Sequence, residues 1–112
     1  MELTTETKGD MAVHRLSGRL DTATSAGAER GILGPLAAGQ FRMILDMRDV
    51  AYVSSAGLRV VLLAAKQAKA AGGGIALFGL QPAVRDVFDI SGFARILAIA
   101  PGEAEAEAML PR

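Results

Sequence analysis

Apolar positions recur along the chain with two periods, one typical of buried strands and one typical of amphipathic helices. Residues 41–47 and 75–78 are nearly continuous apolar runs, as expected of central strands covered by other elements. Between them, residues 56–71 have the spacing of a helix with one apolar side. The residues at its i, i+3, i+4 and i+7 positions are expected to face the sheet: Leu58, Val61, Leu62 and Ala65.

The opposite side of this helix is less polar than a solvent-facing side usually is. Val60 and Leu63 lie there beside Gln67. An apolar outer face on a small domain is a candidate docking surface for another protein. Burial against a neighbouring helix is the alternative, and the sequence favours neither.

The rest of the chain continues the alternation of strands and helices. Residues 2–7 and 11–17 predict two strands joined by a turn, and residues 95–100 predict a last strand. Further helices are expected up to about residue 38, from Pro82 to about Ile90, and from Pro101 through Met109. This order predicts an α/β fold in a single domain over residues 1–112, with a small, mixed, mostly parallel sheet, an N-terminal hairpin and about four flanking helices.

Composition narrows the classes of function. Twelve basic and twelve acidic side chains cancel, so the charge balance gives no sign of a nucleic-acid or anionic-membrane partner. The absence of cysteine excludes disulfides and thiolate metal sites. No apolar run approaches the roughly 20 residues of a membrane span, and the amino terminus lacks a signal core. We therefore expect a soluble, cytoplasmic protein without a metal or cofactor.

Two adjacent hydroxyls, Ser54 and Ser55, stand where the helix over residues 56–71 begins. A serine at a helix start caps free backbone N–H groups. A phosphoryl group there would meet the same donors and the positive end of the helix dipole. The residues alone leave both roles open, helix capping and a site of phosphorylation.

Other candidates for chemistry are weak. His14 is the only histidine and has no neighbouring metal-binding type, so a surface or core role is expected rather than a ligand. Ser55 lacks the preceding glycine of a hydrolase nucleophile elbow, since Val53 occupies that place. Asp46 follows an apolar run, as the phosphoacceptor of a response regulator does, but the lysine and acidic pair of such a site are missing. We expect Asp46 to order the loop leading to Ser55, and we expect no enzymatic activity.

Residues 52–59, Tyr-Val-Ser-Ser-Ala-Gly-Leu-Arg, resemble the signature of STAS domains, the family of bacterial anti-sigma factor antagonists. The commonest family form is Asp-Ser-Ser-Gly-Leu-Gly or Asp-Ser-Ala-Gly-Leu. Residues 18–21 and 88–93 are also similar to family segments at the expected places. The resemblance covers nearly the whole chain and implies the same architecture, a small sheet flanked by helices.

The resemblance implies that Ser55 is the phosphorylated serine. The aspartate that precedes it in the family is replaced by Ser54, which becomes a competing acceptor, and the second family glycine is replaced by Arg59. The implied function is a partner switch. The unphosphorylated protein binds an anti-sigma factor that is also a serine kinase, phosphorylation releases it, and a serine phosphatase resets the switch.

The expected partner surface combines residues around the serines with the apolar outer side of the helix: Asp21, Thr22, Ser54, Ala56, Gly57, Arg59, Val60 and Leu63. Asp21 has an alternative role as a cap of the first helix. The resemblance also leaves a second function open, because STAS-like domains serve as structural subunits of lipid-transport or signalling complexes without phosphorylation.

Overall fold

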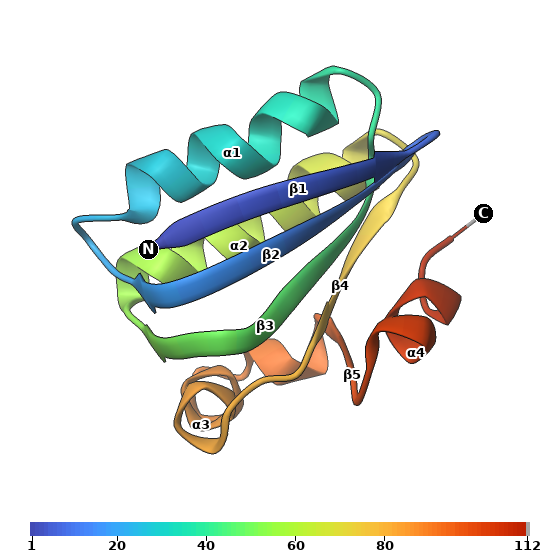
Figure 1. The fold of residues 1–112 in the computed structure, drawn as a ribbon. Helices are drawn as coiled ribbons and strands as arrows, with labels where there is room; N and C mark the ends of the chain where they lie inside the picture. The colour runs from blue at the N-terminus through green and yellow to red at the C-terminus, as the bar shows by residue number, and fades with distance from the viewer. Residues whose placement is uncertain (112) are drawn as a thin grey trace.

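Five strands form one sheet whose order in space, β1-β2-β3-β4-β5, is also their order along the chain. The computed structural model describes residues 1–111 (Figure 1). Strands β1 (Glu2–Lys8) and β2 (Met11–Leu20) form an antiparallel hairpin. Strands β3 (Arg42–Val53), β4 (Gly74–Phe78) and β5 (Ala98–Ala100) then add in parallel. The predicted mixed sheet with an N-terminal hairpin is confirmed.

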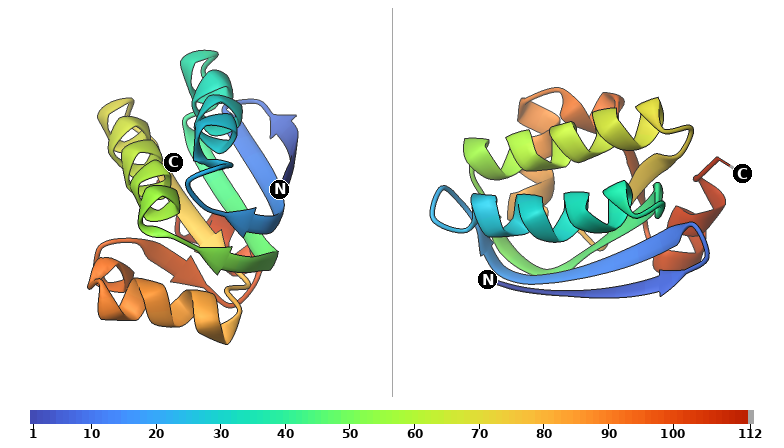
Figure 2. Two further views of the ribbon diagram at one scale, coloured as in Figure 1. Left: turned by 90° about the vertical axis from the view of Figure 1, so that its left-hand side faces the viewer. Right: turned by 90° about the horizontal axis from the view of Figure 1, so that it is seen from above.

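Helices cover both faces of this sheet. Helices α1 (Ser25–Ala37) and α2 (Ser55–Ala70) lie side by side on one face (Figure 2). Helix α3 (Pro82–Ile90) packs against β3 and is followed by the 3-10 turn η1 (Phe93–Arg95). Helix α4 (Glu103–Ala108) contacts β3, β4 and β5, on the other face.

Alternation along β3 divides the core into two layers. Met43, Leu45 and Met47 belong to the larger cluster, which they share with residues of α1, α2 and α3. Ile44 points the other way and belongs to the smaller cluster beneath α4, with Leu110. Central strands that are buried on both faces read as continuous apolar runs, which explains why this segment was predicted correctly.

Three strand boundaries differ from the sequence prediction by three residues or more, and the first is that β2 continues to Leu20 instead of ending at Ser17. Strand β3 does not end at Met47 but continues to Val53, pairing with residues 17–20 of β2 through two register shifts. Only Val50 and Val53 are buried in this extension, so its apolar pattern is too sparse to reveal a strand. The last strand is shorter than predicted, because Arg95 belongs to η1 and residues 96–97 form a turn and a bend.

Candidate functional site

Helix α2 begins directly where β3 ends, and Ser54 is its N-cap. Ser54 is extended (φ −91°, ψ 177°), and its Oγ accepts a hydrogen bond from the backbone N–H of Gly57, with 3.3 Å between N and Oγ. The Ser54 N–H donates to the carbonyl oxygen of Leu20 at 2.9 Å. Ser54 is half-buried. The capping role predicted for this pair of serines therefore belongs to Ser54, and it ties the start of α2 to the end of β2.

Ser55 is the first residue of α2, and it is exposed. The first turn of α2 carries no acidic side chain. The positive end of the helix dipole and the free N–H groups of this turn are therefore not already neutralised. Of the two hydroxyls, Ser55 has the better access and an environment that favours a negative charge.

Gly57 has a packing role that the sequence did not indicate. A Cβ at this position would lie 2.5 Å from the carbonyl oxygen of Leu20 and 3.1 Å from Cγ1 of Val53. Glycine is thus required for α2 to approach the end of β2 this closely. Gly57 is buried, which contradicts its expected place on the partner surface.

The loop from β2 to α1 leaves the sheet at the same end of the strands as Ser54, because Leu20 pairs with Val53. The Asp21 carboxylate accepts hydrogen bonds from the N–H groups of Ala23 (3.1 Å) and Thr24 (3.2 Å). Burial pushes the pKa of Asp21 upward, but its hydrogen bonds, including one from Arg19, outweigh this and hold the pKa below its usual value. Asp21 therefore stays ionised and organises the turn that precedes α1. It is not the predicted cap of this helix, because the N-cap is Thr24 and the N–H groups that Asp21 binds lie before α1.

The structure brings Asp21 and Thr22 to the same edge of the sheet as Ser54 and Ser55. Thr22 is exposed, as a partner-binding residue must be, and Asp21 is partly exposed. Ala56, in the first turn of α2, is half-buried. Two loops that are far apart in sequence thus contribute to one surface.

Two exposed side chains beside this surface, Arg19 and Tyr52, were not among the predicted site residues. The guanidinium carbon of Arg19 lies 4.2 Å from the centroid of the Tyr52 ring, a cation–π contact between β2 and the extension of β3. Tyr52 is one of the few large exposed apolar side chains, with 41% of its surface accessible. Predicting the strand through residue 53 would have revealed this neighbour on β2.

The apolar outer face predicted for α2 is wrong at Val60. Val60 is 1% exposed and belongs to the core cluster that includes Ala28 and Ile32 of α1. Leu63 is half-buried. The alternative, burial against the neighbouring helix, holds for Val60, because α1 lies beside α2.

Arg59 is exposed and forms a long ion pair with α1. Its Nη2 lies 3.6 Å from Oε1 of Glu29. An exposed pair of this length is a weak constraint, so Arg59 keeps the freedom to bind other anions.

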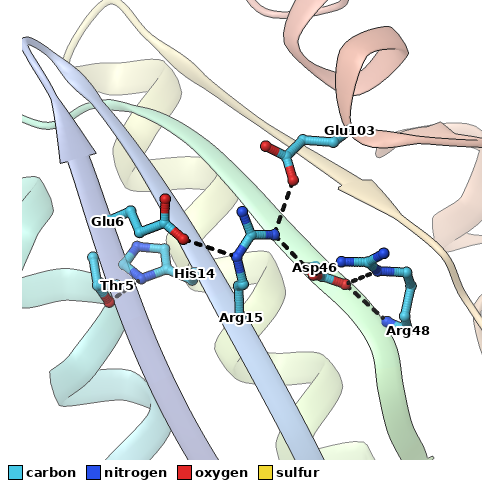
Figure 3. Close-up of polar contacts among 7 residues, drawn as sticks. All are labelled: Thr5, Glu6, His14, Arg15, Asp46, Arg48 and Glu103. Atoms are coloured by element: carbon cyan, nitrogen blue, oxygen red, sulfur yellow. Dashed lines mark hydrogen bonds and ion pairs between the residues drawn. The ribbon is translucent and has the colours of Figure 1, made fainter.

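Asp46 is not near Ser55, which corrects its expected role. It lies within β3 on the face covered by α4, where Arg15 and Arg48 bind it (Figure 3). Arg15 Nη1 lies 3.0 Å from Asp46 Oδ2 and also contacts Glu103, while its Nε contacts Glu6. Burial pushes the pKa of Asp46 upward, but the hydrogen bonds from Arg48 and Arg15 hold the pKa below its usual value. The resulting network joins β1, β2, β3 and α4 and is structural.

His14 is a core residue, which is one of the two positions predicted for it. It is fully buried in β2, and its Nδ1 lies 2.8 Å from Oγ1 of Thr5, while its Nε2 has no hydrogen-bond partner among residues 1–111. Desolvation lowers the pKa of His14 to about 4. The imidazole is therefore neutral near pH 7.

Within residues 1–111, no cluster of three or more His, Cys, Asp or Glu residues has the geometry to hold a metal ion. Over the same residues, no helix is both long enough and apolar enough to span a bilayer.

A comparison with known families decides between the possible classes of α/β domain. The model of the STAS domain family matches residues 2–106, nearly the whole chain. The chain belongs to the STAS domain family. This confirms the resemblance at residues 52–59, and the site at the start of α2 lies within the matched region.

Several proteins that are similar to this STAS domain are described as anti-sigma factor antagonists. A protein of Bordetella bronchiseptica named "Putative anti-sigma factor antagonist BtrV" is 39% identical over 108 residues, covering 96% of this chain and 93% of the relative. A Thermotoga maritima structure described as a "putative anti-sigma factor antagonist" superposes with a TM-score of 0.88 at 20% identity, covering 95% and 92% of the two chains. Its low identity makes it a likeness of fold.

The unphosphorylated form of the anti-sigma factor antagonist SpoIIAA superposes with a TM-score of 0.80 at 26% identity, covering 94% of this chain and 92% of SpoIIAA. SpoIIAA has also been solved in a phosphorylated form. The STAS domain described here presents one accessible serine at a helix start and an ordered acidic turn beside it.

Proposed function

We propose that this STAS domain is an anti-sigma factor antagonist whose binding is switched by phosphorylation of Ser55. The proposal rests on the different environments of the two serines. The hydroxyl of Ser54 is occupied in capping α2, whereas Ser55 is exposed at the first helical position. The names of the relatives support the class of partner.

The switch would act through charge on a surface that keeps its shape. A phosphoryl group adds a charge of about −1.5 to −2 at pH 7. At the first position of α2 the helix dipole and free N–H groups stabilise that charge, so α2 remains folded. A partner packed on Ser55, Ala56 and Thr22 would then meet a desolvated dianion beside the ionised Asp21. Like-charge repulsion and desolvation would release it.

The partner would be an anti-sigma factor with serine kinase activity, and a serine phosphatase would reverse the modification. ATP would bind to the kinase, so this chain would supply neither catalysis nor a cofactor site. Its role would be regulation of transcription in the cytoplasm. Arg59 and Leu63 would border the contact surface on the flank of α2, while the buried Gly57 and Val60 would act by holding α2 in place.

The first test is phosphosite mapping by mass spectrometry after incubation with ATP and a lysate of the source cells. Phosphate is expected on Ser55 and absent from the Ser55→Ala variant. Phosphate on Ser54, or on neither serine while a kinase in that lysate is active, would contradict the proposal. The latter outcome would favour a permanent structural interface.

Binding to the anti-sigma factor provides the second test. Ser55→Ala is expected to bind as the wild type does, whereas Ser55→Glu should weaken binding at least tenfold, about 1.4 kcal/mol. Ser91→Glu, which adds the same charge at an exposed serine after α3, is the matched control and should leave binding unchanged. Equal binding by the two Ser55 variants would overturn the mechanism.

A further inference from the structure

Strand β1 is an open edge of the sheet. Among residues 1–111 it pairs only with β2, and none of the views of the fold shows another element beyond it (Figures 1 and 2). All of its side chains are exposed except Leu3, which is half-buried. Every second residue of an edge strand directs its N–H and C=O groups away from the sheet, where they form a template for another strand.

The sequence of β1 is complementary to itself. When two copies of residues 2–8 pair antiparallel about Thr5, Glu2 of each copy lies opposite Lys8 of the other. The remaining opposed pairs are Leu3 with Thr7, Thr4 with Glu6, and Thr5 with itself. Opposite charges facing each other across strands stabilise a sheet, and this register repeats the favourable pair twice by symmetry.

Neighbouring registers are disfavoured by the same side chains. If one copy of β1 is shifted by two residues along the other in one direction, only residues 2–6 of each copy pair, and Glu2 lies opposite Glu6. A slide in the other direction pairs only residues 4–8 and sets Glu6 against its own copy. Like charges directly opposite each other destabilise a sheet, so charge selects the register centred on Thr5.

The two faces of β1 fit a symmetric pairing. Leu3 and Thr5 lie on the face of α1, since a Cβ at Gly31 of α1 would contact Leu3 and Thr5 bonds to the buried His14. Glu6 lies on the other face, where it contacts Arg15. Pairing of Thr5 with Thr5 keeps these faces aligned, so the two α1 helices lie on the same side of a joined sheet.

A shallow groove beside β1 adds surface to this contact. Its volume is about 370 Å³, and it runs between the starts of β1 and α1. Most of its lining is small or apolar: Met1, Leu3, Ala23, Thr24, Ala26, Gly27 and Arg30. A second copy paired to β1 would border this groove and reduce the exposure of Leu3.

We propose that the chain forms a homodimer by antiparallel pairing of β1 with β1 of a second copy, in the register centred on Thr5. The two sheets become one continuous sheet with a two-fold axis through Thr5. Ser55 follows β3, which β2 separates from the interface, so each copy keeps Ser55 accessible. The dimer does not depend on phosphorylation and is a property beyond the proposed switch.

Charge reversal tests the register directly. Sedimentation equilibrium over a concentration series should show a dimer for the wild type. Either single substitution, Glu2→Lys or Lys8→Glu, should raise the dissociation constant of the dimer at least tenfold. The double variant E2K/K8E should restore it. A one-to-one mixture of the two single variants should also form a heterodimer, since every opposed charge pair is then favourable. Lys66→Glu, a reversal on α2, is the matched control and should leave the dimer unchanged.

The absence of native cysteine permits a second test. Thr5→Cys places two thiols directly opposite each other, and mild oxidation should cross-link it fully. Thr4→Cys leaves the thiols offset along the strands and should cross-link at least tenfold more slowly. A wild type that remains monomeric, a dimer indifferent to the Glu2 and Lys8 reversals, or a double variant that stays monomeric would each overturn the proposal.

Discussion

Lowering the pH from 7 to 5 is expected to destabilise the folded protein through a single residue, His14. Its imidazole is fully buried, Nδ1 contacts Thr5, and Nε2 has no hydrogen-bond partner in the part of the chain that the structure describes. Protonation would place a charge, and an N–H without an acceptor, in the core. Burial therefore lowers the pKa of His14 from 6.5 to about 4. The folded state favours the neutral ring.

The direction of the pH dependence follows from this difference. Because the pKa is lower in the folded state, the unfolded chain takes up the proton first as the pH falls. The stabilisation is complete above pH 6.5 and is lost progressively between pH 6.5 and 4. The whole shift corresponds to roughly 3 kcal/mol, of which about 2 kcal/mol is lost between pH 7 and pH 5.

Urea unfolding at several pH values, followed by circular dichroism, measures this loss. His14→Leu removes the titrating group and should show a much flatter dependence between pH 7 and 5, whatever its absolute stability. Asp21 and Asp46 do not interfere, because both their ordinary pKa of 3.8 and their lowered pKa in the folded protein lie below pH 5. Equal slopes for the wild type and the variant between pH 7 and 5 would refute the reasoning.

Further substitutions test the packing at the site and the network beneath α4. Gly57→Ala should cost about 2 kcal/mol or more in a thermal unfolding experiment, because the new Cβ would lie 2.5 Å from the Leu20 carbonyl oxygen. Gly27→Ala, where no such close contact exists, should instead stabilise the protein by about 0.5–1 kcal/mol. Equal effects of the two substitutions on stability would contradict the packing argument. Asp46→Asn should cost about 1–3 kcal/mol by the same measurement, since it weakens the bonds of a buried carboxylate to two partly exposed arginines. Asp89→Asn breaks an exposed i,i+4 ion pair and should change stability by less than about 0.5 kcal/mol. A loss of stability as large as that caused by Asp46→Asn would contradict the expected difference between the buried and the exposed carboxylate.

The prediction of elements succeeded where the local pattern was strong. Helix α3 spans Pro82–Ile90 as predicted, with Val84 and Phe88 buried, because a proline start and helical spacing act within a few residues. Strand β3 was predicted too short. Its second half is held by pairing with β2, and residues there are largely exposed, so no continuous apolar run marks it.

The candidate site was predicted in part. The sequence placed Ser54 and Ser55 at a helix start, but it did not distinguish the capping hydroxyl from the accessible one. That distinction depends on the extended backbone of Ser54 and on its bond to Gly57. Arg19 and Tyr52 were missed, because their contact joins two strands whose pairing had not been predicted.

The sequence by itself determined the order of strands and helices, the STAS signature at residues 52–59 and the hydroxyls at the start of α2, because periodicity, capping and turn preferences act between near neighbours. Tertiary structure alone decided that Val60 is buried, that Gly57 must lack a side chain and that Asp46 joins a structural ion network. Each of these depends on a distant segment: α1 beside Val60, Leu20 against Gly57, and Arg15 across from Asp46. The local sequence indicates that a residue is suited to burial or pairing, but the tertiary fold determines which distant residue it contacts.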